Sequence, residues 1–271
     1  MEGQVIPKRI YDAVCTGGVA EVEEWLASLA APRDVVNVEV PIYVGGNATL
    51  LFYVTFGMPF GASHAELVRL LISHGANVNQ LESLSLSDGA SPLHNLLHFF
   101  GPDCSGKAVI DAVKSLLSAG AEVNRDFHGR FPITVVIEKL AKRLYPDSAV
   151  IAEVVTMLLR AGASVDSSSG GKLSGWQTMR QVHATAVRCN DDYPWRANLL
   201  ADPHFITIKA QIDGVHAHGS WRAYIMAPRL ELLTLCGLAN RGKIRSTDPA
   251  LNNLVALPNE LICQVLAFWI G

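Results

Sequence analysis

The residues best suited to chemistry in this sequence are histidines. His216 and His218 alternate along the chain, and His183 and His204 lie upstream of them. Two alternating histidines bind a metal when a strand presents both and further ligands complete the coordination geometry. The sequence indicates neither a strand nor further ligands. We therefore expect these histidines on a solvated loop and predict no metal site.

Cysteine and glycine patterns give no catalytic site either. Cys104 lies in the string FGPDCSG, which is typical of a loop, but a cysteine nucleophile needs a base, and the neighbouring sequence marks none. The glycine pairs at 17–18, 45–46 and 170–171 lack the spacing of phosphate-binding loops. We predict no catalytic residue, no cofactor and no enzyme.

The composition indicates the size and general class of the protein. The chain has 271 residues, of which 49% are hydrophobic and 17% are charged, enough for one large domain or two small ones with a sizeable core. The net charge is -3 and the isoelectric point is about 6.3, which argues against a dedicated nucleic-acid binder. We expect no nucleic-acid partner.

The sequence also bears on the compartment. Mean hydropathy is +0.24, yet no apolar run reaches the roughly 18 residues of a membrane helix. The first residues lack the apolar stretch of a secretory signal. The five cysteines are far apart and form no CxxC motif, which fits a reducing compartment. We expect a cytoplasmic or nuclear protein that is not secreted and has no membrane partner.

One short string recurs three times, and its form indicates helices. It reads GANVN at 75–79, GAEVN at 120–124 and GASVD at 162–166. Each copy follows a run whose apolar residues recur at spacings of three and four, which is the pattern of an amphipathic helix. The glycine falls where a helix needs a left-handed residue after its last turn.

A second string precedes these helices and is clearest as GASPLH at 89–94. Pro92 suits the first helical position, where no backbone N–H is needed, and Ser91 suits the N-cap. Ser63 and Glu66 have the spacing of a capping box for the next helix. Each unit is thus predicted to be a turn, a helix, a loop, a second helix and a glycine turn.

This unit resembles the ankyrin repeat, whose consensus carries Gly-x-Thr-Pro-Leu-His at its first helix and Gly-Ala-Asp-Val-Asn after its second. The best match is 88–94 followed by 120–124. In this resemblance His94, one helical turn before His98, is the motif histidine and has a structural role. The resemblance implies an all-α fold, an ankyrin-type helical repeat solenoid with a helical C-terminal cap. In such folds each unit buries its apolar side against the next unit.

The domain organisation follows from these matches. A divergent first unit would have its first helix at 10–14, its turn at Gly17 and Gly18, its second helix at 22–26 and its closing turn at 34–37. The predicted domains are ankyrin-like repeats at 6–190, with units at about 6–37, 47–79, 89–124 and 129–166 and a decayed unit from 175, then an irregular connection at 191–220 and a C-terminal helical region at 221–271.

The units are longer than the standard ankyrin length of about 33 residues. The distances from Gly75 to Gly120 and from Gly120 to Gly162 are 45 and 42 residues. The excess falls mainly in the loop between the two helices of each unit. Such loops can be recognition elements, or they can drift neutrally because insertions in surface loops cost little. Both interpretations stay open.

The resemblance implies that the protein binds a partner protein on the concave face made by turn tips and first helices. We expect a monomer. A few buried anchors would supply most of the affinity. The tip residues that we select are Tyr43, Asp126, Phe127 and Arg130, each of which could equally be a solvated turn residue.

The C-terminal region offers a second function. The string from Leu257 to Leu266 looks like the opening of an F-box, which docks on Skp1. Leu232 and Cys236, followed by the Leu-Pro pair at 257–258, resemble a SOCS box instead, which binds elongin and a cullin. Either would make the chain a substrate-recruiting adaptor of a cullin-type ubiquitin ligase. The alternative is a plain scaffold whose last helices form a buried cap. The candidate docking residues are Leu257, Pro258, Leu261, Val265 and Leu266.

Overall fold

The computed structural model describes most of the chain and shows a mainly helical protein. It describes residues 6–41, 46–56, 59–84, 89–141, 147–188 and 194–241, with the single residues Asn253, Leu257 and Leu261. The all-α class predicted from the sequence is confirmed. The chain divides into two compact units, Met1–His216 and Ala217–Gly271. In the described part of the chain, no helix is both long enough and apolar enough to cross a bilayer.

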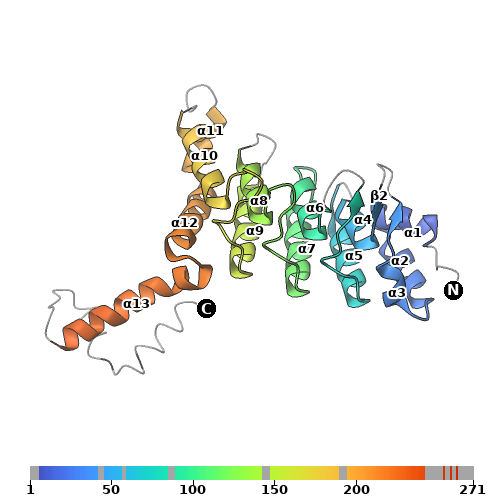
Figure 1. Cartoon of the computed structure of the whole chain (residues 1–271), viewed down its shortest axis with the longest axis horizontal. Coiled ribbons are helices and arrows are strands. Elements are labelled where there is room, and N and C mark those ends of the chain that lie inside the picture. The colour runs from blue at the N-terminus through green and yellow to red at the C-terminus, as the bar shows by residue number, and fades with distance from the viewer. Residues whose placement is uncertain are drawn as a thin grey trace. The chain divides into compact units, whose positions relative to one another are not determined.

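The helices of the first unit form two rows (Figure 1). Successive helices of a row contact each other, and α1, α4, α6 and α8 also contact a partner in the other row. The first row consists of α1 (Lys8–Thr16), α4 (Leu50–Phe56), α6 (Pro92–Phe99), α8 (Pro132–Leu140) and α10 (Gly175–Arg188). The second row consists of α2 (Val19–Ala27), α5 (Ala62–Ser73), α7 (Gly106–Ser118) and α9 (Ser148–Arg160).

Short extended segments connect successive pairs. Strands β1 (Val40–Pro41), β2 (Gly46–Ala48) and β3 (Ser83–Leu84) form an antiparallel sheet in that order. Val40 pairs with Ala48, and Gly46 pairs with Leu84. Backbone hydrogen bonds between these segments therefore link neighbouring helix pairs, in addition to the contacts between the helices.

The predicted helix ends are largely confirmed. Gly75, Gly120 and Gly162 have φ values of 89°, 88° and 92°, which is the left-handed region that glycine adopts without a steric penalty. Ser91 is the N-cap of α6, where its Oγ accepts a hydrogen bond from the backbone N–H of His94 at 3.3 Å. The sequence rules for helix caps therefore located the ends of these helices correctly.

The capping box predicted at Ser63 and Glu66 is wrong. Helix α5 already includes Ser63, because the extended Gly61 is its N-cap. The N–H of Gly61 donates to Nδ1 of His64 at 3.2 Å, and the same ring lies 3.1 Å from the carbonyl oxygen of Cys15 through Nε2. A histidine that bridges two helix pairs therefore caps this helix.

Other expectations also need correction. The closing turn expected at 34–37 is instead the end of a short helix, α3 (Pro32–Val36), which Pro32 starts. The stretch 191–220, expected to be irregular, holds α11 (Pro194–Ala201) and α12 (Pro203–His218). Helix α12 buries a stripe at spacings of three and four, which the sequence contained: Phe205, Ile208, Ile212 and Val215.

The loops inside the pairs are tied to one another. Phe60, between α4 and α5, is only 1% exposed, and its carbonyl accepts the N–H of Ser105 at 2.8 Å. The Sγ of Cys104 accepts the N–H groups of Phe60 and Gly101, both at 3.4 Å. Cys104 therefore organises a loop, as its half-buried position suggests.

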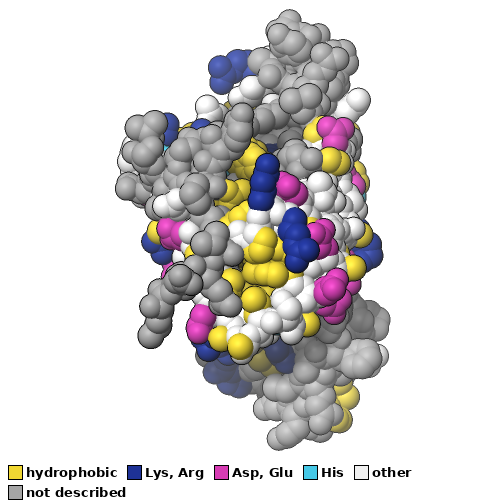
Figure 2. All heavy atoms as spheres, turned by 90° about the vertical axis from the view of Figure 1, so that its right-hand side faces the viewer, with side chains coloured by type: hydrophobic (Ala, Val, Ile, Leu, Met, Phe, Trp, Pro, Cys, Tyr) yellow, Lys and Arg dark blue, Asp and Glu magenta, His cyan; other side chains and the backbone are white. Residues whose placement is uncertain are grey.

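Figure 2 views the end of the first unit that carries α1, α2 and α3. Hydrophobic side chains occupy the middle of this face, with lysine or arginine and acidic side chains around them. A terminal helix pair has only one neighbouring pair to cover its apolar side, which accounts for such a face.

The second unit contains α13 (Trp221–Asn240) and two described leucines beyond it, Leu257 and Leu261. Cys236 is 2% exposed and forms a small core with Leu232, Leu233 and Leu257. The region expected to be helical at 221–271 thus has one long helix in its described part.

Candidate functional site

Asparagines at successive turns make the same pair of hydrogen bonds, and we call this set the asparagine ladder. Asn37 is the C-cap of α3, and Asn79 and Asn124 lie in the turns after α5 and α7. Each side-chain amide donates to the carbonyl oxygen of the next glycine turn, and its Oδ1 accepts the N–H two residues beyond that glycine. The donor bonds reach Gly75 (3.0 Å), Gly120 (2.9 Å) and Gly162 (2.8 Å), and the acceptor bonds come from Asn77 (2.7 Å), Glu122 (2.8 Å) and Ser164 (2.7 Å).

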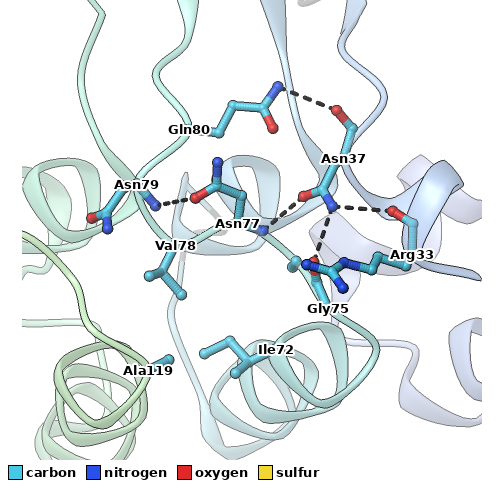
Figure 3. A pocket seen from close by; sticks show the side chains of 10 residues that line it. Arg33, Asn37, Ile72, Gly75, Asn77, Val78, Asn79, Gln80 and Ala119 are labelled. Carbon is cyan, nitrogen blue, oxygen red and sulfur yellow. Dashed lines mark hydrogen bonds between the residues drawn. The ribbon is translucent and has the colours of Figure 1, made fainter.

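The first step of the asparagine ladder lines a hollow of about 530 Å³. Figure 3 shows Asn37 between the backbone of Gly75 and that of Asn77, while Gln80 donates to the carbonyl of Asn37 at 3.2 Å. Asn77 in turn accepts the N–H of Asn79 at 3.0 Å. These amides already bind backbone groups of adjacent turns. We therefore assign the hollow a structural role in holding the turns together, and not a ligand.

The asparagine ladder ends at Asp166, which occupies the equivalent position in the third copy of the string, GASVD. Its carboxylate bonds Nδ1 of His216, whose ring stacks on Trp176 with centroids 3.8 Å apart. The indole N–H of Trp176 donates to Asp213 at 3.2 Å. The sequence predicts a solvated loop for His216. It lies instead on α12, and its ring contacts the last glycine turn through Asp166.

His218 ends α12, and His183 and His204 lie on α10 and α12, so the predicted solvated loop is wrong for all of these histidines. Within the residues that the structure describes, no three histidine, cysteine, aspartate or glutamate side chains are grouped to share a metal ion.

A tight hairpin presents the predicted tip residues. Phe127 and Arg130 exchange both backbone hydrogen bonds at 3.0 Å. His128 and Gly129 between them have φ values of 51° and 76°, as a two-residue type I′ turn requires. A Cβ on Gly129 would lie 2.6 Å from the carbonyl oxygen of Ser169, so the hairpin packs directly on the next turn.

The predicted tip residues have different surroundings. Asp126 is exposed. Phe127 is half-buried and packs on a cluster that includes Phe52. Arg130 is also half-buried and lies 3.5 Å from Glu138. Tyr43 lies outside the described residues. The structure brings Phe127 and Arg130 together, whereas their role in binding stays a prediction.

Phe127 and Arg130 line a cavity of about 240 Å³, which we call the tip pocket. It lies among α6, the hairpin, α8 and the turn before α10. The sequence patterns did not predict the pocket, because its members come from four separate segments. Its lining residues are His94, His98, Phe127, His128, Arg130, Val135 and Lys172.

His94 forms the buried wall of the tip pocket. It is 1% exposed, and its Nδ1 lies 2.9 Å from Oγ of Ser91. Burial lowers the pKa of His94 to about 4, so the ring is neutral near pH 7. The nearby backbone groups of Arg130 and Arg125 raise this pKa in part. The buried Nε2 of His94 has no hydrogen-bond partner among the described residues.

The predicted docking residues of the second unit are described only in part. Leu257 packs against Cys236, so the chain itself covers the cysteine that the SOCS-box resemblance requires. Leu261 is 44% exposed. Pro258, Val265 and Leu266 lie outside the described residues.

Comparison with known proteins adds no assignment. No protein-family model matches the chain, and no curated protein matches it in sequence. A function must therefore be argued from the asparagine ladder, the hairpin and the tip pocket.

Proposed function

We propose that this chain is a non-enzymatic protein–protein interaction module built from ankyrin-type repeats. The observation that carries the proposal is the asparagine ladder, in which one side chain makes the same two bonds at three successive turns. Such repetition is expected where each unit is stabilised mainly by its neighbours, as in a helical repeat solenoid. Repeat solenoids use extended surfaces to bind other proteins.

The binding face in this proposal is formed by the hairpin tip and the first row of helices. Phe127 and Arg130 supply an aromatic and an arginine anchor, two residue types that are frequent in interface hot spots. Asp126 beside them is exposed and can report on a bound partner without lying in the packed hairpin. The face therefore has both an anchor and a place for a probe.

A photo-cross-linker tests this placement. The photoreactive residue benzoyl-phenylalanine would replace Asp126 in one variant and Lys107 in the other. Lys107 is a matched control, because it is also exposed but lies on α7 in the second row. In a eukaryotic cell extract we expect light-dependent protein adducts from position 126 and none from position 107. Equal adducts at both positions, or none at either, would contradict the proposal.

A second candidate function is the ubiquitin-ligase adaptor. The observation that favours it is that the second unit is separately compact and exposes three leucines, Leu230 (57%), Leu235 (41%) and Leu261 (44%). Contiguous exposed apolar patches mark docking surfaces, and this candidate requires the three leucines to belong to one such patch. Since Leu257 already packs on Cys236, the adaptor would dock through Leu261 and not through Cys236.

Binding to purified Skp1 and to purified elongin complex tests this candidate. We expect one of the two to bind the full chain and Leu261→Ala to weaken that binding at least tenfold. Leu173→Ala, a leucine of similar exposure (41%) in the first unit, should change it less than threefold. Binding to neither protein would refute the adaptor and leave the interaction module.

A further inference from the structure

The tip pocket has a chemistry that a general protein-binding role does not explain. Two cationic side chains, Arg130 and Lys172, line it together with three imidazoles. Phe127 and Val135 supply its apolar walls, and no carboxylate is among its lining residues. Glu138 pairs with Arg130 and Asp126 precedes the hairpin, but neither lines the pocket. The lining is therefore complementary to a negative charge.

We propose that the tip pocket binds the carboxylate side chain of an aspartate or glutamate in a partner peptide. This inference depends on the proposed interaction function and names the chemistry of the partner. Charge-assisted hydrogen bonds from arginine and lysine to a carboxylate are about twice as strong as neutral ones, which makes such a residue an anchor.

The size of the pocket supports a single side chain as its occupant. Its volume of about 240 Å³ is below the roughly 300–1,000 Å³ of cavities that hold drug-sized ligands. It is open to one acidic side chain but too small for most cofactors. The tip pocket is thus a subsite of an interface.

The two cations are available to a ligand. The stem of Lys172 packs over Gly129, because a Cβ on that glycine would lie 2.7 Å from Cγ of the lysine. Its ammonium has no ion-pair partner among the residues that the structure describes. Arg130 has five N–H donors, and its one ion pair with a described residue is a long contact of 3.5 Å to Glu138. Donors therefore remain on both side chains.

Apolar surface continues from the pocket. The ring of His98 lies 4.8 Å from that of Phe99, which is also 4.8 Å from the ring of Phe56. Phe99 is 39% exposed and Phe56 is 49% exposed, although both are large aromatic side chains. The partner peptide would place an apolar residue on this pair and its acidic residue in the tip pocket. Burial of the apolar residue would keep water from the carboxylate contacts.

Selection from a random peptide library tests the inference on the full-length chain. A phage-displayed library would be panned against the immobilised protein, and the best peptide would be synthesised with its acidic residue, with the neutral amide in its place, and with phosphoserine there. Fluorescence polarisation gives each affinity. We expect the selected peptides to share an acidic residue near an apolar one, and the amide version to bind at least tenfold more weakly.

Variants locate the effect. On Lys172→Gln the preference for the acid over the amide should fall below about threefold, and on Lys107→Gln it should stay unchanged. Lys172 is exposed, and its ammonium has no ion pair with any residue that the structure describes. An unaltered unfolding midpoint is therefore expected, and it checks that the variant folds.

Each other outcome overturns the inference in a different way. Peptides that bind without an acidic preference, or a preference that Lys172→Gln leaves intact, refute the carboxylate site but keep the interaction module. A phosphoserine peptide that binds at least tenfold more tightly than the acidic one would assign the pocket to phosphate instead. If the library yields no binder and position 126 gives no cross-link, the proposed function fails as well.

Discussion

Replacing Asn79 with alanine should lower the free energy of unfolding by about 1–2 kcal/mol. The substitution removes the bond to the carbonyl of Gly120 at 2.9 Å and the bond from the N–H of Glu122 at 2.8 Å. A hydrogen bond contributes about 1 kcal/mol net, and water can replace part of it at this half-exposed site. Because both bonds connect successive helix pairs, the loss falls on the coupling between them.

Urea unfolding followed by circular dichroism measures this loss. The control is Asn77→Ala, which removes a bond within one turn, from the N–H of Asn79 at 3.0 Å, and should cost about half as much. Asn79→Asp should cost at least as much as Asn79→Ala, because it keeps the acceptor for Glu122 but sets a carboxylate oxygen against the carbonyl oxygen of Gly120. A cost for Asn79→Ala below 0.5 kcal/mol, or equal to that of Asn77→Ala, would refute a coupling role for the asparagine ladder.

Three further predictions concern single residues. Burial lowers the pKa of His94 to about 4 from 6.5, so the unfolded chain binds more protons between these values. His94 should therefore contribute a fall of about 3 kcal/mol in the free energy of unfolding as the pH drops from 6.5 to 4, and His94→Gln should remove this contribution in urea titrations. Gly129→Ala should cost about 1–3 kcal/mol in thermal unfolding, because φ is 76° and the new Cβ would meet Ser169 and Lys172, whereas no cost would show that the hairpin is not fixed. Asp147→Ala should cost about 1 kcal/mol in urea, because its Oδ1 caps α9 through the N–H groups of residues 149 and 150, and Asp147→Asn should recover most of it.

The sequence predicted those parts of the fold that depend on local rules. Gly75, Gly120 and Gly162 mark helix ends because their backbone conformation favours glycine, and Ser91 marks a helix start because its hydroxyl accepts a backbone N–H. The capping box at Ser63 failed because a tertiary contact competed with it: the ring of His64 bonds both its own helix start and a residue 49 positions earlier. Local patterns contain no information about such contacts.

The candidate site was harder to predict for the same reason. Phe127 and Arg130 were selected from the turn, and the structure does place them in one pocket. Lys172 joins them only because Gly129 allows the next turn to approach within contact distance, and nothing in the local sequence around residue 172 indicates this. His98 and His128 likewise enter the pocket from different segments.

The change from asparagine to aspartate at position 166 explains how the repeated bonding ends. At Asn124 the side chain needs both a donor and an acceptor, because the next turn offers a carbonyl and an N–H. After the third copy the partner is His216 of α12, and a carboxylate is the better acceptor for an imidazole N–H. Trp176 fixes the same ring by stacking. A single substitution in the repeated string therefore replaces a bond to a following unit with a bond to a helix that covers the end.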